Sequence, residues 1–535
     1  LTFCYRSEPK LYGSLKGISM KYDAIVIGSG SAGSIIATRL TEDPNKHVLL
    51  LEAGPDYPDF EQLPEEVKFG FATEADVMTS DHNWQFNGRA TDTAREMMVP
   101  RGKVTGGSSA INGQVFLRGV PEDYDSWAEE GNGEWTYEKC LPFFRKLETD
   151  TDFHDDFHGS DGPIIARRFK RDDWLPAQVA FYDACKEAGF PDCEDHNDPD
   201  STGVGPTPFN NPNGIRWSTA LGYLDPARNR LNLTLRPNCT VHKILFEGNR
   251  ATGVQVESGG ETFVVQGDQI ILSGGAIGSP QILMLSGIGP REHLDSLGIK
   301  VIADLPGVGQ NLRDHPGVWV TWKTREGFSL DGLAPRMQVS LRYTADGSNL
   351  RNDMKIGMQS FATGRVNEGG NRMEPLGIRI TGGIYLAAGA GELKLASTDP
   401  NVQPILDYNY LADPFDRDRL REMVRLCVKL GEHDSFTDII EERVDPTDAD
   451  LESNDSLDEW IKREVTTSQH ISCTCKMGPA SDAMAVVDQY GNVHGIEGLK
   501  VADASIMPDC IRANTNVTTM MIGERVAEFL IADKK

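Results

Sequence analysis

The sequence predicts a protein of two parts: an α/β domain with a nucleotide-binding architecture and an α+β domain built on an antiparallel sheet. Three observations lead to this prediction. A glycine-rich turn joins a short apolar strand to a helix within residues 22–40, strand-like alternation recurs between residues 318 and 387, and 535 residues are too many for one hydrophobic core.

The α/β prediction rests on residues 22–52. An apolar, β-branched strand at residues 22–27 leads into the turn Gly28-Ser-Gly-Ser-Ala-Gly33, a helical pattern follows to Leu40, and a second strand at residues 47–51 ends in Glu52. In a Rossmann-like unit the glycines let a pyrophosphate approach the helix N-terminus, and the acidic residue binds a ribose hydroxyl. The order therefore predicts a dinucleotide site. A glycine turn made only for packing is the alternative, and the motif alone does not separate FAD from NAD.

Two further glycine-rich segments could face the same ligand. Residues 100–112 are rich in glycine and serine and lie between Trp84 and Phe116, although an ordinary surface loop can have the same composition. The turn at residues 273–280 repeats the strand–glycine–helix order. Around it we predict strands at residues 231–244, 251–256 and 269–272, and a helix at residues 281–285.

The α+β prediction rests on residues 318–464. Alternating apolar residues predict strands at residues 318–324, 337–343 and 378–387, and helical spacing predicts a helix at residues 415–430. The acidic run at residues 445–459 is typical of a solvated helix and its entry. Together these elements predict a layer that covers the nucleotide domain and shapes a substrate pocket.

The C-terminal region carries the candidate chemistry. His470 offers a base, and Asn514 lies just before a helix predicted from about residue 515. A base beside a polar partner suits removal of a proton from an alcohol next to a redox cofactor. A buried structural histidine and a plain helix N-cap at Asn514 are the alternatives.

Composition limits the possible partners. The net charge of −27 argues against nucleic acid and anionic membrane surfaces, and no run of eighteen apolar residues predicts a membrane span. Nine cysteines without repeating spacing indicate reduced thiols and a cytoplasmic location. His154 and His158 have the spacing of a helical metal pair, but Gly159, Gly162 and Pro163 favour a loop, so no metal is expected.

Residues 1–19 carry no apolar stretch of the kind found in a secretory signal. Because Met20 directly precedes the first predicted strand, we expect residues 1–19 to be an N-terminal extension that is disordered or encoded upstream of the native start.

Four ordered blocks resemble the glucose–methanol–choline (GMC) oxidoreductase family over nearly the whole chain from Lys21. They are residues 28–52, residues 102–119, residues 275–289 and the pair of segments around His470 and Asn514. Thr105 departs from the second block, where an aliphatic residue is usual, and Cys473 stands where relatives usually have glycine. The run of residues 475–478 and the ending Asn514-Thr-Asn516 look like the choline-dehydrogenase branch.

The resemblance implies FAD as the cofactor. Gly28, Gly30, Ser31 and Ala32 would hold the pyrophosphate, Glu52 the adenosine ribose, and Val241 the adenine through its backbone. The flavin side would be formed by Trp84, Val104, Gly107, Asn112, Gly113, Gln114 and Val115. Asp503 and Ala504 would lie near the pyrophosphate and ribityl chain, and Ala53 and Thr515 complete the set. Some relatives attach FAD through a histidine just before the residue matching Asn112; Ile111 stands here, so non-covalent FAD is expected.

The resemblance also implies the reaction. His470 would take the hydroxyl proton of an alcohol as a hydride leaves for flavin N5, giving an aldehyde or ketone, and Asn514 would donate to the developing alkoxide. A choline-like alcohol is one candidate substrate. Oxygen, a quinone and a carrier protein are the possible electron acceptors, and a monomer or a homo-oligomer is expected. A non-redox lyase on the same scaffold and a flavin-carrying partner protein without turnover are the alternatives.

The predicted domains are discontinuous. Residues 20–160, 225–316 and 465–535 are expected to form the FAD-binding domain, and residues 161–224 and 317–464 the substrate-binding domain.

Overall fold

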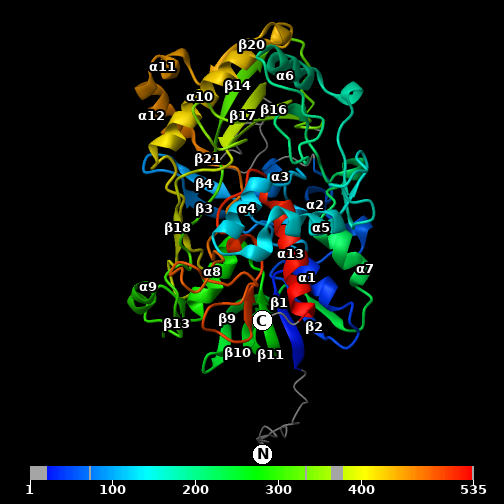
Figure 1. Ribbon diagram of the computed structural model, residues 1–535, viewed down its shortest axis with the longest axis vertical. Coiled ribbons are helices and arrows are strands. Elements are labelled where there is room, and N and C mark those ends of the chain that lie inside the picture. Colours follow the sequence, from blue (N-terminus) through cyan, green and yellow to red (C-terminus); the bar gives the residue numbers. More distant parts are fainter. Residues whose placement is uncertain (1–20, 71–73, 332–333, 363–376, 533–535) are drawn as a thin grey trace, which may run out of the picture.

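Two large β-sheets lie toward opposite ends of the long axis of the molecule, with helices between and around them (Figure 1). The structure is a computed structural model, and it describes residues 21–70, 74–331, 334–362 and 377–532. The predicted extension at residues 1–19 lies outside the described residues.

The first sheet contains the predicted dinucleotide unit. Its parallel strands run in the order β8-β2-β1-β11-β22. Every residue of β2 is buried, as the apolar sequence requires of a strand covered on both faces. Helices α1 and α13 pack against each other, so the C-terminal helix is held beside the N-terminal unit. The bounds are β1 Tyr22–Ile27, α1 Gly33–Leu40, β2 Val48–Leu51, β8 Leu233–Arg236, β11 Glu261–Leu272, β22 Leu499–Val501 and α13 Thr515–Ile531.

Two of the predicted strands have other limits in the structure. The strand predicted at residues 231–244 is two strands, β8 and β9 (Thr240–Glu247), because Pro237 and the left-handed Asn238 (φ 50°) interrupt it. The strand predicted at residues 269–272 is only the end of the twelve-residue β11. Its first half pairs with β10 (Arg250–Ser258) and its second half with β1, so a single strand belongs to both an antiparallel and a parallel ladder.

The helix predicted at residues 281–285 begins earlier. Helix α8 spans Gly275–Leu285 and includes Pro280, which lacks the N–H that would bond to the carbonyl of Ala276. The Thr474 hydroxyl donates to that carbonyl instead (2.7 Å). The segment that follows His470 is thereby fixed to the start of α8.

The second sheet is antiparallel, in the order β20-β14-β17-β16-β15-β7, with β21 paired to β14. The predicted strands and the helix α10 are present, and the acidic run contains α11 and most of α12. Strands β7, β16, β20 and β21 were not predicted. Glycine and proline in β7, and lysine and glycine in β16, are uncommon in strands. The bounds are β7 Gly203–Pro206, β14 Pro316–Thr324, β15 Val339–Tyr343, β16 Met354–Gln359, β17 Ile378–Ile384, α10 Pro414–Gly431, β20 Ile440–Asp445, α11 Asp448–Leu451, α12 Asn454–Glu464 and β21 Thr466–Thr467.

A third sheet, in the order β18-β19-β3-β4, joins two segments that are far apart in the chain. Its strands are β3 Phe86–Arg89, β4 Glu96–Val99, β18 Glu392–Lys394 and β19 Ile405–Asp407. The remaining helices and strands are α2 Glu65–Lys68, α3 Glu74–Thr79, α4 Pro121–Glu129, α5 Tyr137–Leu147, β5 Glu148–Asp150, β6 Ile164–Ala166, α6 Pro176–Glu187, α7 Asp225–Ala227, β12 Ile288–Gly289, α9 Arg291–Ser296 and β13 Ala303–Asp304. None of the helices in the described ranges is both long and apolar enough to cross a membrane.

Residues 154–158 form a loop, as predicted. His158 contacts two carboxylates there, Asp155 through Nδ1 (2.8 Å) and Asp195 through Nε2 (3.0 Å). It also lies near Glu148 and Asp150, in an arrangement that could surround an ion. The carboxylates of Glu148 and Asp150 already pair with arginine side chains, Glu148 with Arg118 and Asp150 with Arg168. The negative charge of this group is therefore neutralised within the protein.

Candidate active site

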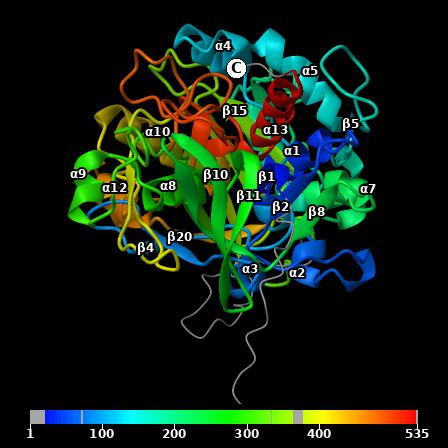
Figure 2. The ribbon, with the colours of Figure 1, turned by 90° about the horizontal axis from the view of Figure 1, so that it is seen from below.

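A cavity of about 1490 Å³ lies between the two large sheets. Its walls come from the carboxyl ends of β1 and β2, the N-terminal ends of α8 and α13, and the inner face of β14, β16 and β17. Figure 2 shows the first sheet from below, with α8 on one side and α1 and α13 on the other. The carboxyl edge of a parallel sheet is where α/β proteins bind their ligands, so this cavity is the candidate active site.

Close backbone packing shapes one end of the cavity. A Cβ at Gly28 (φ 94°) would lie 2.4 Å from the carbonyl oxygen of Ser273, and a Cβ at Gly107 (φ 53°) would lie 2.6 Å from Cα of Gly30. Real Cβ atoms do not approach that closely, so glycine is required at both positions. The first turn and the loop at residues 100–112 thus meet, and both leave their backbone N–H groups near the N-terminus of α1.

Glu52 ends β2 and lies in the wall of the cavity. Its carboxylate accepts from the backbone N–H of Ser29 (3.0 Å), from the Ser29 hydroxyl (2.7 Å) and from the N–H of Gly54 (2.9 Å). Burial raises the pKa of Glu52 despite these hydrogen bonds. These hydrogen bonds hold the carboxylate in a fixed position beside Ser29 of the glycine turn.

Almost all of the residues singled out from the sequence line this one cavity. They come from parts of the chain that are far apart in sequence: Gly28, Gly30, Ser31, Ala32, Glu52, Ala53, Trp84, Gly107, Asn112, Gly113, Gln114, Val115, Val241, His470, Asp503, Ala504, Asn514 and Thr515. Val104 is not among the lining residues, because its side chain is buried in a small apolar cluster with Val67 and Ile111.

His470 and Asn514 meet in the wall of the same cavity, and Asn516, two residues further on, accepts from the Ser31 hydroxyl of the glycine turn (2.6 Å). Nδ2 of Asn514 is 2.9 Å from Nε2 of His470. Asn514 occupies the N-cap position of α13, but its side chain makes no capping bond and is directed to the imidazole instead. Asp314 positions the histidine, because its Oδ1 accepts from the backbone N–H of His470 (2.9 Å) and its Oδ2 from the hydroxyl of Tyr410 (3.0 Å).

A second histidine, which the sequence did not single out, fixes the protonation of the first. Nδ1 of His315 is 2.9 Å from Nδ1 of His470, and Nε2 of His315 is 2.8 Å from the carbonyl oxygen of Ile511. Burial lowers the pKa of His315 to about 3, and burial and nearby positive charges hold the pKa of His470 well below its ordinary value. Both rings are therefore neutral at pH 7, with one N–H each.

The hydrogen bond between His315 and the carbonyl oxygen of Ile511 determines the tautomers of both histidines. Since a carbonyl oxygen only accepts, the proton of His315 lies on Nε2, and its Nδ1 accepts. The proton of His470 must then lie on Nδ1, where it donates to His315. Nε2 of His470 is left with a lone pair, and Asn514 donates an amide N–H to it. A neutral imidazole with an unprotonated nitrogen facing a cavity is a general base.

Comparison with known proteins gives the family. The models of the N-terminal and C-terminal GMC oxidoreductase domains match residues 22–317 and 388–523. The chain belongs to the GMC oxidoreductase family. This confirms the resemblance read from the sequence, the predicted fold class, FAD as the cofactor, and oxidation of an alcohol as the reaction class.

Similar GMC oxidoreductases match along nearly the whole chain. The oxygen-dependent choline dehydrogenase of Burkholderia multivorans is 38% identical over 539 residues, which cover 95% of this chain and 93% of the relative. The one of Photobacterium profundum is 33% identical and covers 96% and 93%. Among solved structures, pyridoxine 4-oxidase from Mesorbium loti has a TM-score of 0.87 at 29% identity, covering 96% of this chain and 99% of the other. A formate oxidase has a TM-score of 0.86 at 25% identity, covering 96% and 98%.

The cavity of this GMC protein fits FAD on three observations. Its volume exceeds the roughly 300–1,000 Å³ of common small-molecule sites, which leaves room for a dinucleotide and a small substrate. Its glycine turn meets the N-terminus of α1, as a pyrophosphate requires. Four of its lining residues carry buried polar atoms that have no partner among the described residues: Gln114 Nε2, Gln469 Oε1, Asn514 Oδ1 and Asn516 Nδ2. Such atoms call for a polar ligand.

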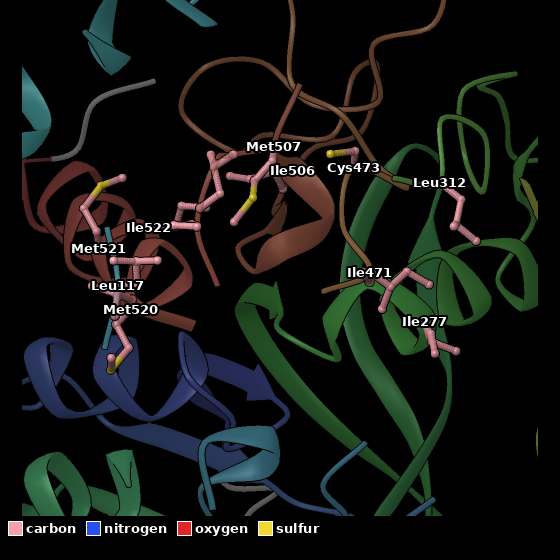
Figure 3. Close-up of a cluster of buried hydrophobic side chains, with 14 of the residues drawn as sticks. Leu117, Ile277, Leu312, Ile471, Cys473, Ile506, Met507, Met520, Met521 and Ile522 are labelled. Carbon is pink, nitrogen blue, oxygen red and sulfur yellow. The ribbon is translucent and has the colours of Figure 1, made fainter. Parts of the chain in front are cut away.

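The thiols of Cys473, Cys475 and Cys510 do not line the cavity of this GMC protein. Cys473 adopts φ 71°, which explains why glycine is usual in relatives, and Figure 3 shows it in a cluster of buried apolar side chains with Ile506 and Met507. Burial raises the pKa of each thiol far above its usual range. A thiolate, which is the reactive form, is therefore disfavoured at all three positions.

Proposed function

We propose that this GMC oxidoreductase oxidises an alcohol with His470 as the general base and Asn514 as its hydrogen-bonding partner. The observation that carries the proposal is the position of Nε2 of His470 in the cavity wall, 2.9 Å from the Asn514 amide nitrogen, from which we infer that Nε2 is the unprotonated nitrogen. The chain of hydrogen bonds from Ile511 through His315 maintains the lone pair on this nitrogen.

The protein's own groups bind the alcohol and move its proton. Bound FAD supplies the acceptor for the hydride that leaves the alcohol carbon. Nε2 of His470 accepts the hydroxyl proton, and such general-base assistance is worth about 10²–10⁴-fold in rate. The Asn514 amide then donates to the oxygen as negative charge develops on it, and losing one donor of this kind costs roughly 3 kcal/mol. The N-terminus of α13 adds a positive electrostatic potential at the same place.

An anaerobic panel of alcohols tests the proposal. The purified protein with bound FAD is mixed with each alcohol in the absence of oxygen, and the absorbance of the flavin is followed. At least one alcohol is expected to bleach the flavin and to yield one equivalent of aldehyde or ketone. Choline belongs in the panel, because similar proteins carry that substrate in their names. If none of the alcohols bleaches the flavin, the lyase and the carrier-protein alternatives replace the proposal.

We also propose that FAD is bound non-covalently. Ile111 lies in the cavity wall beside Asn112, at the place where a histidine would be needed for attachment, and it carries no nucleophile. Acid precipitation is expected to leave the yellow chromophore in the supernatant. A yellow pellet, with flavin still attached after denaturing electrophoresis, would disprove this prediction.

Three further assignments remain proposals. We propose the domain division given above, which the two large sheets support. A cytoplasmic location is supported by the eight cysteines of the described ranges, all of them free thiols. Oxygen is the first electron acceptor to test, followed by a quinone and a carrier protein, since similar proteins are named oxygen-dependent.

A further inference from the structure

The substrate-side wall of the cavity is one face of the second sheet. Most of the residues that line the cavity alternate along its strands: Gly317 and Trp319 on β14, Lys355, Gly357 and Gln359 on β16, and Arg379, Thr381 and Gly383 on β17. Gly382 of β17, which has no side chain, lines the cavity as well. Alternation of this kind is expected where one face of a sheet borders a cavity.

Lys355 lies in this wall next to positions that carry no side chain. It pairs in register with Gly383, and Gly383 pairs with Gly317, so the three residues form one row across the strands. Residues opposite each other in antiparallel strands point to the same face. On one side of Lys355 the next two residues of the row, Gly383 and Gly317, have no side chain, so the space on that side is left to the cavity, whereas Arg342 lies on the other side.

Lys355 is a buried cation that has no counter-ion among the described residues. Its side chain is 6% exposed and lines the cavity, yet no carboxylate of those residues lies within ion-pair distance. Its charged neighbour on β15 is another cation, Arg342, which pairs with it in register. Burial, and then the charge of Arg342, lower the pKa of Lys355 to about 7. A buried ammonium group is costly unless an anion or hydrogen-bond acceptors compensate it.

Lys355 also lies close to the proposed base. Its Nζ is 5.4 Å from the centre of the Tyr385 ring, and that ring stacks on His315 with 4.3 Å between centroids. Tyr385 is also 6.1 Å from the His470 ring, centre to centre. One aromatic ring thus separates the ammonium group from the imidazole that would receive the hydroxyl proton. Both residues, Lys355 and His470, line the same cavity.

We propose that the substrate is an alcohol that carries a carboxylate, with the hydroxyl at His470 and the carboxylate at Lys355. This inference rests on the proposed function, because it uses His470 to place the hydroxyl. The same lysine would repel the quaternary ammonium group of choline. The chain would therefore differ in substrate charge from the relatives whose names include choline.

The test compares alcohols matched in shape but not in charge. We choose 4-(hydroxymethyl)benzoate against 4-isopropylbenzyl alcohol, 4-hydroxybutanoate against 4-methylpentan-1-ol, and choline. In the wild-type holoenzyme, the carboxylate member of at least one pair is expected to reduce the flavin with kcat/KM about 10- to 100-fold above its neutral partner and choline, the range of a charge-assisted hydrogen bond. In Lys355→Met this advantage should vanish, so that the carboxylate and its neutral partner reduce the flavin with similar kcat/KM.

A binding measurement separates the two proposals. Benzoate and butanoate cannot be oxidised, and their binding is followed by the change in flavin absorbance. Their dissociation constants should rise about 10- to 100-fold in Lys355→Met. They should stay unchanged in the control Lys323→Met, which removes an exposed lysine of the same sheet that does not line the cavity.

Each outcome decides one of the proposals. Carboxylates that bind wild type and Lys355→Met equally, or choline oxidised in preference to every carboxylate, would overturn the inference and leave the proposed function standing. Lys355-dependent binding of carboxylates without oxidation of any alcohol would support the anion site and refute the proposed function.

Discussion

Replacing His470 with alanine is expected to lower kcat/KM for the best alcohol of the panel by about 10²–10⁴-fold, with FAD still bound. The variant lacks the lone pair that receives the hydroxyl proton, whereas the hydrogen bonds that Glu52 makes to Ser29 and Gly54 do not involve His470. Anaerobic rapid mixing gives the rate of flavin reduction, and absorbance after denaturation gives the FAD content.

His494→Ala serves as the matched control. His494 belongs to the same C-terminal segment and contacts the carbonyl oxygen of Gly478 (3.1 Å), but it does not line the cavity. The His494→Ala variant should reduce the flavin at the wild-type rate. Flavin reduction at the native rate in His470→Ala would rule out the assignment of the base.

The pH profile of the wild-type enzyme gives a second check on His470. Because burial and nearby positive charges hold its pKa well below 6.5, the imidazole is neutral at pH 6.5 and above and is lost as a base only when the pH falls through that lowered value. We therefore expect kcat/KM to show no decline on the acidic side until well below pH 6.5. A decline centred on an ordinary histidine pKa would contradict this account.

Replacing His315 with leucine is expected to lower kcat by about 10²–10⁴-fold, although His315 does not line the cavity. Leucine offers His470 no acceptor at Nδ1, so the tautomer with the proton on Nε2 becomes the better one. Asn514 then turns its carbonyl oxygen toward that proton, and the lone pair disappears. His315 is in this account a positioning residue.

His315→Gln separates positioning from packing. A glutamine can accept from Nδ1–H of His470 through Oε1 and donate to the carbonyl oxygen of Ile511 through Nε2, so it can replace both hydrogen bonds of His315. The glutamine variant should recover at least about tenfold of the activity lost in the leucine variant, at similar FAD content. Equal activity in the two variants, or a leucine variant as active as wild type, would remove His315 from the mechanism.

Much of the fold follows from local sequence patterns. The turn at residues 28–33 was predicted correctly because glycine spacing between a buried strand and a helix is a short-range signal. Strand β16 was missed although its residues alternate, because it contains lysine and glycine, which are uncommon in strands. The early start of α8 was missed because Thr474, far away in the chain, compensates for the proline.

The candidate site was only partly predictable. His470 and Asn514 were found because they lie in a motif of the GMC family. His315 and Lys355 were not found, because no spacing within the chain marks either one. An Asp-His-Pro sequence after a turn was the only available signal for His315. Lys355 stands in a strand whose sequence gives no sign that its lysine faces a cavity.

The dinucleotide unit, the family and the motifs around His470 and Asn514 can be read from the chain alone, because each depends on residues that are neighbours in sequence. Two properties of the site depend on how the chain folds. The protonation of His470 depends on a histidine 155 positions away and on the carbonyl group of Ile511. The charge that faces the substrate depends on the register of β14, β17 and β16, which places two glycines beside Lys355. Hydrogen bonds and sheet register join residues across space, and their partners are fixed only when the chain has folded.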